Sequence, residues 1–252
     1  MEYNPLPKTT PMLDQLRYLL LQVRNPDDPM RGHEVDCFAS TLRCPPSRIR
    51  AVDLLRDRPG RAAFDDADIV LLGGSGDYSV AEGGPWMEFA LDAMRGLHEM
   101  SKPTFASCWG FHAMAKAMGG DVVTDPARAE VGTLDVRLTP AGEQDPVFGS
   151  LPATFHAQAG HEDTVDPLPA DAVLLAASDR ANQAFRFAGK PIYCTQFHPE
   201  LSRETLLDRL RAYPKYVEAI TGLPYDEFVE TRTHPSETGA LLLRFVEEVM
   251  GK

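Results

Sequence analysis

The segment PTFASCWGFHAMA, residues Pro103–Ala115, carries no formal charge and decides the fold class. Its first part, Pro103–Ser107, is an apolar run typical of a strand that is buried on both faces. Its second part begins the small-residue stretch Trp109–Met118, which predicts a helix that ends at a Gly-Gly pair. A strand, a tight turn and a helix in this order form the layout of a nucleophile elbow, with Cys108 in the turn.

Small residues on both sides of Cys108 support this interpretation. Ala106 and Gly110, two residues before and after the cysteine, allow the chain to fold tightly against itself. The following helix would present its positive end to the thiolate, and the amide of Trp109 would face an oxyanion on a substrate carbonyl. The alternative is a buried cysteine that ends a core strand. The elbow pattern by itself leaves both interpretations open.

The chain around the elbow alternates between strand-like and helical patterns, which predicts βαβ units and a mostly parallel sheet. Before the elbow we expect strands at Arg17–Val23, Ile49–Leu55 and Ala67–Leu72, and helices at Glu34–Leu42 and Pro85–Met100. After it we expect strands at Val131–Leu138, Ala172–Ala177, Ala184–Phe187 and Ile192–Phe197, and helices at Ser202–Arg211, Pro214–Thr221 and Pro235–Met250.

The simplest organisation is a single α/β domain over residues 1–252. Its motif-bearing region covers about residues 16–200, and a helical extension covers about residues 201–252. The first ten residues are expected to form an irregular arm, and Ser236 is placed to cap the last helix. We expect the extension to pack against the same domain, because amphipathic surface helices usually do so.

A thiol nucleophile needs a base, and the base needs a group that orients it. Among the seven histidines, His198 has the most suitable surroundings, because it follows an apolar strand in the sequence Thr195–Glu200, TQFHPE. Residues two apart in an extended segment point to the same side, so His198 and Glu200 are expected to lie together. A surface histidine beside an acid is the alternative for this short motif.

Composition excludes several classes of function. The chain has 252 residues, 25 basic and 37 acidic, and a formal charge of −12, which argues against nucleic-acid and anionic-membrane partners. The sequence shows neither a secretory signal nor an apolar run near the ~18–20 residues of a membrane helix, so a cytoplasmic protein is expected. The four cysteines form no C-x-x-C pair, and neither a metal site nor a cofactor is expected.

Two other motif interpretations fail. Gly74-Ser75-Gly76 begins a G-x-G pattern, but Ser79 stands where a dinucleotide fingerprint has its third glycine. Gly189-Lys190 is followed by Pro191 rather than by serine or threonine, so a P-loop is not predicted.

Four segments together resemble the class I, triad-type glutamine amidotransferase family, and in particular the glutaminase domain of GMP synthases as a stand-alone chain. The similarity runs from about Leu16 to Glu200. The segments are, in chain order, Asp68–Ser75, Ala106–Gly110, Gly160–Val165 with the strand that follows it, and the pentapeptide Gln196–Glu200, QFHPE. The pentapeptide matches the family's most diagnostic motif residue for residue.

This resemblance implies a fold and a set of site residues. The fold would be a three-layer, flavodoxin-like α/β sandwich with a central mostly parallel sheet and additional C-terminal helices. Cys108 would be the nucleophile, His198 the base and Glu200 its orienting carboxylate. The amides of Gly74 and Trp109 would form the oxyanion hole. The substrate would be bound by His112, Gly160 and His161, although His161 is as readily structural.

The sequence departs from the family pattern mainly at His112, where glutamine is usual, and this puts the substrate in question. A histidine cannot present a donor and an acceptor in the geometry of a carboxamide. Smaller departures are Phe111 where histidine is common, Ala106 where glycine is usual and Ser75 where proline is common. None of these changes affects the predicted triad.

Three functions remain open from the sequence. The first is hydrolysis of glutamine through a γ-glutamyl thioester on Cys108, with ammonia passed to a separate synthetase or acceptor chain. The second is a hydrolase or transferase that acts on γ-glutamyl amides or peptides other than free glutamine, which His112 makes credible. The third is a non-catalytic binding module of the same fold, against which the retention of Cys108, His198 and Glu200 argues.

Overall fold

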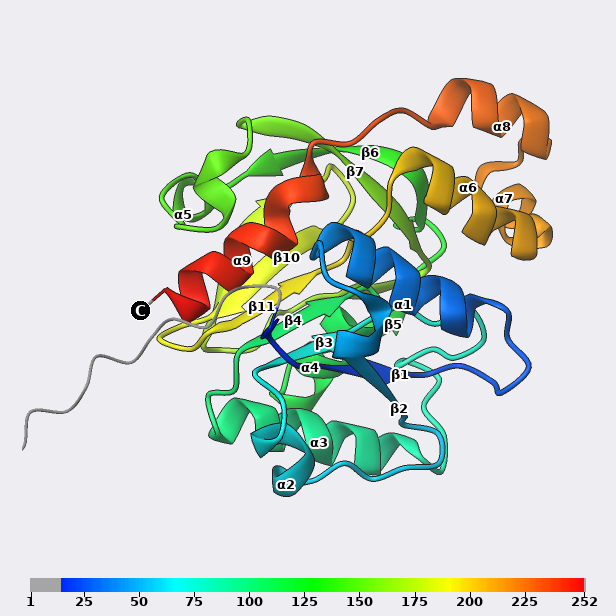
Figure 1. Cartoon of the computed structure of the whole chain (residues 1–252). Coiled ribbons are helices and arrows are strands. Elements are labelled where there is room, and N and C mark those ends of the chain that lie inside the picture. Colours follow the sequence, from blue (N-terminus) through cyan, green and yellow to red (C-terminus); the bar gives the residue numbers. More distant parts are fainter. Residues whose placement is uncertain (1–14, 252) are drawn as a thin grey trace, which may run out of the picture.

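The computed structural model describes residues 15–251, apart from the side chains at positions 214 and 215. Its centre is a nine-stranded sheet with the order β2-β1-β3-β4-β11-β10-β9-β6-β7, beside which β5 and β8 form a separate pair (Figure 1). The strands are β1 (Tyr18–Gln22), β2 (Ile49–Asp53), β3 (Ile69–Leu72), β4 (Thr104–Ser107), β5 (Val122–Thr124), β6 (Glu130–Leu138), β7 (Thr154–His161), β8 (Asp163–Val165), β9 (Ala172–Ala177), β10 (Asn182–Phe187) and β11 (Ile192–Thr195). The irregular arm expected at the N-terminus lies outside the described residues.

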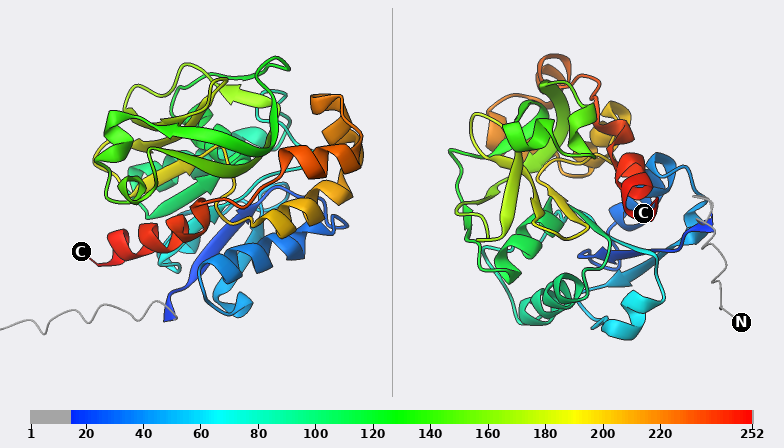
Figure 2. Two further views of the ribbon diagram at one scale, coloured as in Figure 1. Left: turned by 90° about the horizontal axis from the view of Figure 1, so that it is seen from above. Right: turned by 90° about the vertical axis from the view of Figure 1, so that its left-hand side faces the viewer.

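The α-helices pack on both faces of this sheet, so the predicted three-layer α/β fold is confirmed. They are α1 (Met30–Thr41), α2 (Arg61–Asp65), α3 (Met87–Glu99), α4 (Trp109–Ala117), α5 (Pro140–Glu143), α6 (Arg203–Ala212), α7 (Pro214–Thr221), α8 (Tyr225–Arg232) and α9 (Leu241–Met250). Short 3₁₀ turns add Pro46–Arg48, Phe148–Ser150 and Thr238–Ala240. Figure 2 shows α1 and α9 together on one side of the sheet, with α2 and α3 on the other.

The two faces of the sheet form two separate cores. Strand β1 shows why, because its alternate side chains enter different cores and all of them are buried. Leu19 and Leu21 pack in the core that contains α3 and α4. Tyr18 and Leu20 pack in the core that contains α1 and α9. A strand with apolar residues in every position is typical of a sheet that helices cover on both faces.

The sheet has a parallel half and an antiparallel half. Strands β2, β1, β3, β4 and β11 pair in parallel, which agrees with the βαβ alternation of the sequence. Strands β10, β9, β6 and β7 continue the sheet in antiparallel pairs. The glycine turn, the cysteine elbow and the segment with His198 follow strands of the parallel half, whereas Gly160 and His161 end β7 of the antiparallel half.

The C-terminal helices differ in detail from those expected. Helix α6 begins at a capping box made by Ser202 and Thr205, close to the expected start. The last helix begins at Leu241 rather than near Pro235, so the prediction that Ser236 caps it is wrong. Helix α8 was not expected, because its sequence YDEFVETR has no continuous apolar stripe. Within residues 15–251, no helix is both long and apolar enough to cross a membrane.

Candidate active site

Three strand ends bring the predicted motifs to one edge of the sheet. Leu72 of β3 lies opposite Ala106 of β4, and Ser107 of β4 lies opposite Thr195 of β11. Because the strands are parallel, the segments that follow them emerge side by side at their carboxyl ends. The glycine turn Gly73–Gly76, the cysteine elbow and the segment Gln196–Glu200 therefore meet there, although they are far apart in the sequence.

Cys108 occupies a strained backbone conformation between β4 and α4. Its φ is +53° and its ψ is −105°, a region that costs a non-glycine residue about 1–3 kcal/mol. Its amide donates to the carbonyl of Thr195 at 2.8 Å, which holds the turn against β11. A Cβ on Gly110 would lie 2.5 Å from that of Leu72, so only glycine fits two residues after the cysteine. The geometry is that of the elbow predicted from the sequence.

His198 and Glu200 form a short, buried hydrogen bond. Nδ1 of His198 donates to Oε1 of Glu200 at 2.7 Å, and both side chains are almost completely buried. Burial alone would lower the pKa of His198, but its interactions with Glu200 and Cys108 raise that pKa to about 9. A Cβ on Gly74 would lie 2.8 Å from Cε1 of His198 and 3.5 Å from Sγ of Cys108, so both side chains converge on this glycine.

Arg209 of α6 adds a positive charge beside this pair, which the sequence motifs did not indicate. Its Nη1 lies 3.6 Å from Oε1 of Glu200 and 3.3 Å from Nδ1 of His198. Since Nδ1 already donates its proton to Glu200, the contact of Arg209 is an ion pair with the carboxylate. Burial would raise the pKa of Glu200, whereas His198 and Arg209 lower it below its usual range. Glu200 is thus held in its ionised form.

The two predicted oxyanion donors differ in their availability. The amide of Trp109 opens α4, at a position where a backbone N–H has no partner within the helix. The amide of Gly74 donates instead to Oε1 of Glu34 at 3.1 Å. Gly74 can therefore contribute to an oxyanion hole only after its N–H leaves Glu34. The thiol of Cys108 donates to the carbonyl of Gly160 at 3.7 Å.

The three predicted substrate-binding residues lie close to Cys108 in the same cavity. His112 is bonded through Nε2 to the carboxamide oxygen of Gln196 at 2.7 Å, and burial lowers its pKa to about 4. Nδ1 of His161 lies 2.9 Å from the carbonyl oxygen of Asp163, and its Nε2 lies 3.2 Å from Oε2 of Glu130. Both nitrogens of His161 are thus occupied, which favours its structural role over contact with a substrate.

The segment around His161 is strand rather than loop. Gly160 and His161 end β7, and Asp163 begins the short strand β8. The carboxylate of Asp163 accepts hydrogen bonds from Ser79 at 2.6 Å and from Thr124 at 2.6 Å. Burial would raise the pKa of Asp163, but these hydroxyl groups lower it.

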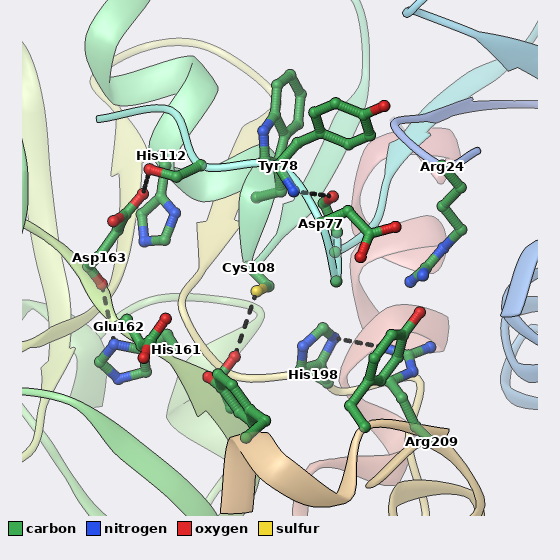
Figure 3. Close-up of a pocket in the computed structure, with 18 of the residues that line it drawn as sticks. Arg24, Asp77, Tyr78, Cys108, His112, His161, Glu162, Asp163, His198 and Arg209 are labelled. Carbon is green, nitrogen blue, oxygen red and sulfur yellow. Dashed lines mark hydrogen bonds between the residues drawn. The ribbon is translucent and has the colours of Figure 1, made fainter. Parts of the chain in front are cut away.

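The C-terminal helices close the other wall of the cavity. A Cβ on Gly76 would lie 2.6 Å from the ring of Tyr213, and one on Gly160 would lie 3.5 Å from that of Tyr216. The hydroxyl of Tyr213 donates to Asp28 at 3.2 Å. The cavity has a volume of about 310 Å³, and Figure 3 shows Cys108 near its centre. The amphipathic pattern of a helix predicts that the helix packs against the domain, but it does not predict which surface the helix covers. The contribution of α6 and α7 to the cavity wall was therefore not predicted from the sequence.

The comparisons with known proteins agree with this fold and arrangement. The family model for class I glutamine amidotransferases matches residues 48–209, which is more than half of the chain. The chain therefore belongs to the class I glutamine amidotransferase family.

Its curated relatives include one subunit of the glutamine-hydrolyzing GMP synthase in each of two archaea. The chain is 34% identical to the protein of Methanopyrus kandleri over 125 residues, which are 48% of this chain and 65% of that protein. It is 32% identical to the protein of Methanocaldococcus jannaschii over 124 residues, which are 49% of this chain and 64% of that protein. The match thus spans less than two thirds of the length of these relatives.

Solved structures share the fold over almost the whole chain. A glutamine amidotransferase from Thermotoga maritima has a TM-score of 0.73 and 20% identity, covering 94% of this chain and 99% of the other. A glutamine amidotransferase from Methylobacillus flagellatus has a TM-score of 0.68 and 20% identity, covering 92% of this chain and 94% of the other. At this identity the likeness establishes the fold alone.

Proposed function

We propose that this chain hydrolyses the side-chain amide of glutamine and releases glutamate and ammonia. The observation that carries the proposal is the convergence of Cys108, in its strained turn, with the hydrogen-bonded pair His198 and Glu200 at one sheet edge. Membership of the family and the names of the glutamine-hydrolyzing relatives support it. A non-catalytic binding module would not need the buried, hydrogen-bonded pair of His198 and Glu200 next to a strained cysteine, and this argues against that alternative.

In the proposed mechanism, the sulfur of Cys108 attacks the amide carbonyl of glutamine. His198, oriented by Glu200, holds the proton of the thiol and gives it to the nitrogen as the carbon–nitrogen bond breaks. Ammonia leaves and a γ-glutamyl thioester remains on Cys108. His198 then takes a proton from water, which attacks the thioester, releases glutamate and restores the thiol.

The amide of Trp109 is the donor available to the developing oxyanion. Backbone donors at such a position typically contribute a factor of about 10²–10³ to the rate. Gly74 is the second proposed donor, and its use requires the bond to Glu34 to open first. His112 and Gly160 are proposed to contact the amino-acid end of the substrate, while His161 supports their position through Glu130 and Asp163.

We further propose that the ammonia serves a separate synthetase or acceptor chain. The relatives from the two archaea are named as one subunit of GMP synthase, which supports an acceptor on another chain. We also propose that the chain folds as one domain. The ring of Phe245 in α9 packs 5.3 Å from that of Phe105 in β4, so the C-terminal extension shares the core of the motif-bearing region.

The test is to incubate the purified chain with glutamine and measure glutamate and ammonia. Cys108→Ala should abolish turnover, whereas Cys44→Ala, beyond the end of α1 and outside the cavity, should retain it. A glutamine-like electrophile should label wild-type protein at Cys108 even where turnover depends on a partner. The absence of both turnover and labelling would refute the proposal.

A further inference from the structure

Asp163 is a buried carboxylate that takes no part in the proposed chemical steps. It begins β8, lines the cavity and is only 6% exposed. An ionised carboxylate is costly to bury unless hydrogen-bond donors surround it. Its two oxygens accept hydrogen bonds from the hydroxyl groups of Ser79 and Thr124, at 2.6 Å each, and from the amide of Ala81 at 3.4 Å. Three donors therefore hold this one side chain beside the site of the reaction.

The two oxygens of Asp163 serve two different segments of the chain. Oδ2 accepts from Ser79 and Ala81, which belong to the loop of residues 75–86 between the glycine turn and α3. Oδ1 accepts from Thr124, which lies opposite Asp163 in the β5–β8 pair and does not line the cavity. Figure 3 shows the carboxylate of Asp163 directed toward the loop, on the same side of Cys108 as His112. Asp163 thus connects the loop to a strand.

The hydrogen bond between Ser79 and Asp163 joins two walls of the cavity. Ser79 belongs to the loop, of which Tyr78 and Glu82 also line the cavity. Asp163 belongs to the wall at the end of β7 and the start of β8, which includes Gly160. Gly160 is proposed to contact the amino-acid end of glutamine. The bond between the two walls therefore sets how closely the loop encloses that end of the substrate.

The other contacts of the loop lie away from Ser79. Asn25 donates to Asp77 at 3.0 Å and accepts from the hydroxyl group of Tyr78 at 2.7 Å. The ring of Trp86 packs 5.8 Å from that of Trp109. Among the described residues, Asp163 is the only hydrogen-bond partner that residues 79–82 have outside the loop. Loss of this partner should therefore displace the middle of the loop and leave its two ends in place.

We propose that Asp163 is a positioning residue that acts through Ser79 to hold the loop against the amino-acid end of glutamine. This inference rests on the proposed function and adds a residue that controls the affinity of its site. A hydrogen bond to a charged group favours the held state by about tenfold or more. The apparent affinity falls in proportion to the fraction of molecules in that state. The triad is fixed by separate bonds, so the effect should appear in KM rather than in kcat.

The test compares Ser79→Ala with Thr124→Val. Each variant removes one hydroxyl group that lies 2.6 Å from the same carboxylate, so both should lower the urea midpoint of unfolding by similar amounts. Only Ser79→Ala releases the loop. We expect it to raise KM for glutamine about tenfold and to keep kcat within about twofold of the wild-type value. Thr124→Val should keep the wild-type KM.

Two further variants complete the design. Ser79→Thr keeps the hydroxyl group and should retain a KM close to that of the wild type. Asp163→Asn weakens the acceptor, so adding Ser79→Ala to it should change KM by only about twofold, because the two side chains act through one bond. If Asp163→Asn folds poorly, the comparison of the Ser79 and Thr124 variants still decides.

The outcomes separate this inference from the proposed function. An unchanged KM in Ser79→Ala, an equal rise in Thr124→Val, or a fall in kcat alone overturns the positioning role and leaves the proposed function intact. If turnover depends on a partner, the concentration of glutamine that protects Cys108 from the electrophile gives the same comparison. The absence of both turnover and labelling of Cys108 refutes the proposed function itself.

Discussion

The carboxylate of Glu34 lies directly beneath the glycine turn and accepts a hydrogen bond from the amide of Gly74 at 3.1 Å. Glu34 is completely buried, and Nη2 of Arg24 donates to the same carboxylate oxygen, Oε1, at 3.1 Å. Gln22 donates to Oε2 at 2.9 Å. A buried ion pair outside the predicted triad thus sets the position of one wall of the active site.

This contact makes Gly73 intolerant of a side chain. A Cβ on Gly73 would lie 2.2 Å from Oε1 of Glu34, a carboxylate that hydrogen bonds from Arg24 and Gln22 hold in place. We expect Gly73→Ala to lower the free energy of unfolding by about 1–3 kcal/mol and to reduce glutamine turnover. Urea denaturation measures the first effect.

The matched control is Gly32→Ala in α1, where a Cβ would contact nothing within 4 Å. Alanine should stabilise this helix interior by about 0.5–1 kcal/mol. Equal unfolding midpoints for the Gly73 and Gly32 variants would contradict the steric role of Glu34.

Glu34→Gln tests the charge rather than the shape of the contact. Glutamine still offers an oxygen to Gly74, but it leaves Arg24 with Asp28 as its remaining carboxylate. Because breaking a buried ion pair is costly, we expect a loss of about 3 kcal/mol in the free energy of unfolding. Asp65→Asn, which affects an exposed pair with Arg61, should change it by less than about 1 kcal/mol. Similar losses in both variants would show that the charge of Glu34 is unimportant.

Stability should depend on pH through His198. Its pKa is about 9 in the folded chain and 6.5 without these interactions, so folding favours the protonated ring. The stabilisation is complete below about pH 6.5 and is lost as the pH rises to about 9. A shift of this size corresponds to about 3 kcal/mol. We expect the difference in unfolding free energy between wild type and His198→Asn to shrink over this range, and a constant difference would contradict the assignment.

The identity of residue 112 should affect the affinity for glutamine. His112 is neutral at working pH, since its pKa is about 4, and its Nε2 is already bonded to Gln196. One ring nitrogen remains for a substrate, whereas a carboxamide offers both a donor and an acceptor. We expect His112→Gln to lower KM for glutamine about fivefold, the effect of one hydrogen bond of about 1 kcal/mol. His33→Gln, beside Cys37, is the control, and an unchanged KM at position 112 would refute the role of this residue in selectivity.

Local motifs predicted the catalytic segments well, because strand ends and tight turns impose residue types within a few positions. The backbone of Cys108, the requirement for Gly110 and the hydrogen bond between His198 and Glu200 have the geometry expected from their sequence neighbourhoods. Their catalytic roles stay predictions.

The sequence patterns did not predict contacts between segments that are distant in the chain. Glu34 and Arg209 read as ordinary helix residues, and their meeting with Gly74 and Glu200 depends on how α1 and α6 pack. The prediction that Ser236 caps the last helix was wrong for a related reason. A serine before an apolar run marks a helix start only if no other turn intervenes, and here a 3₁₀ turn precedes Leu241.

The close approach of Tyr213 to Gly76 has an evolutionary consequence. The steric reason for a glycine at position 76 is the aromatic ring of Tyr213, which is distant in the sequence, and not the turn itself. Relatives whose C-terminal region lacks an equivalent ring are released from this constraint. Variation at position 76 should therefore follow the presence or loss of the α6–α7 junction across the family, while Gly110, which is enclosed by Leu72 of β3 and Ala106 of β4, should vary independently of it.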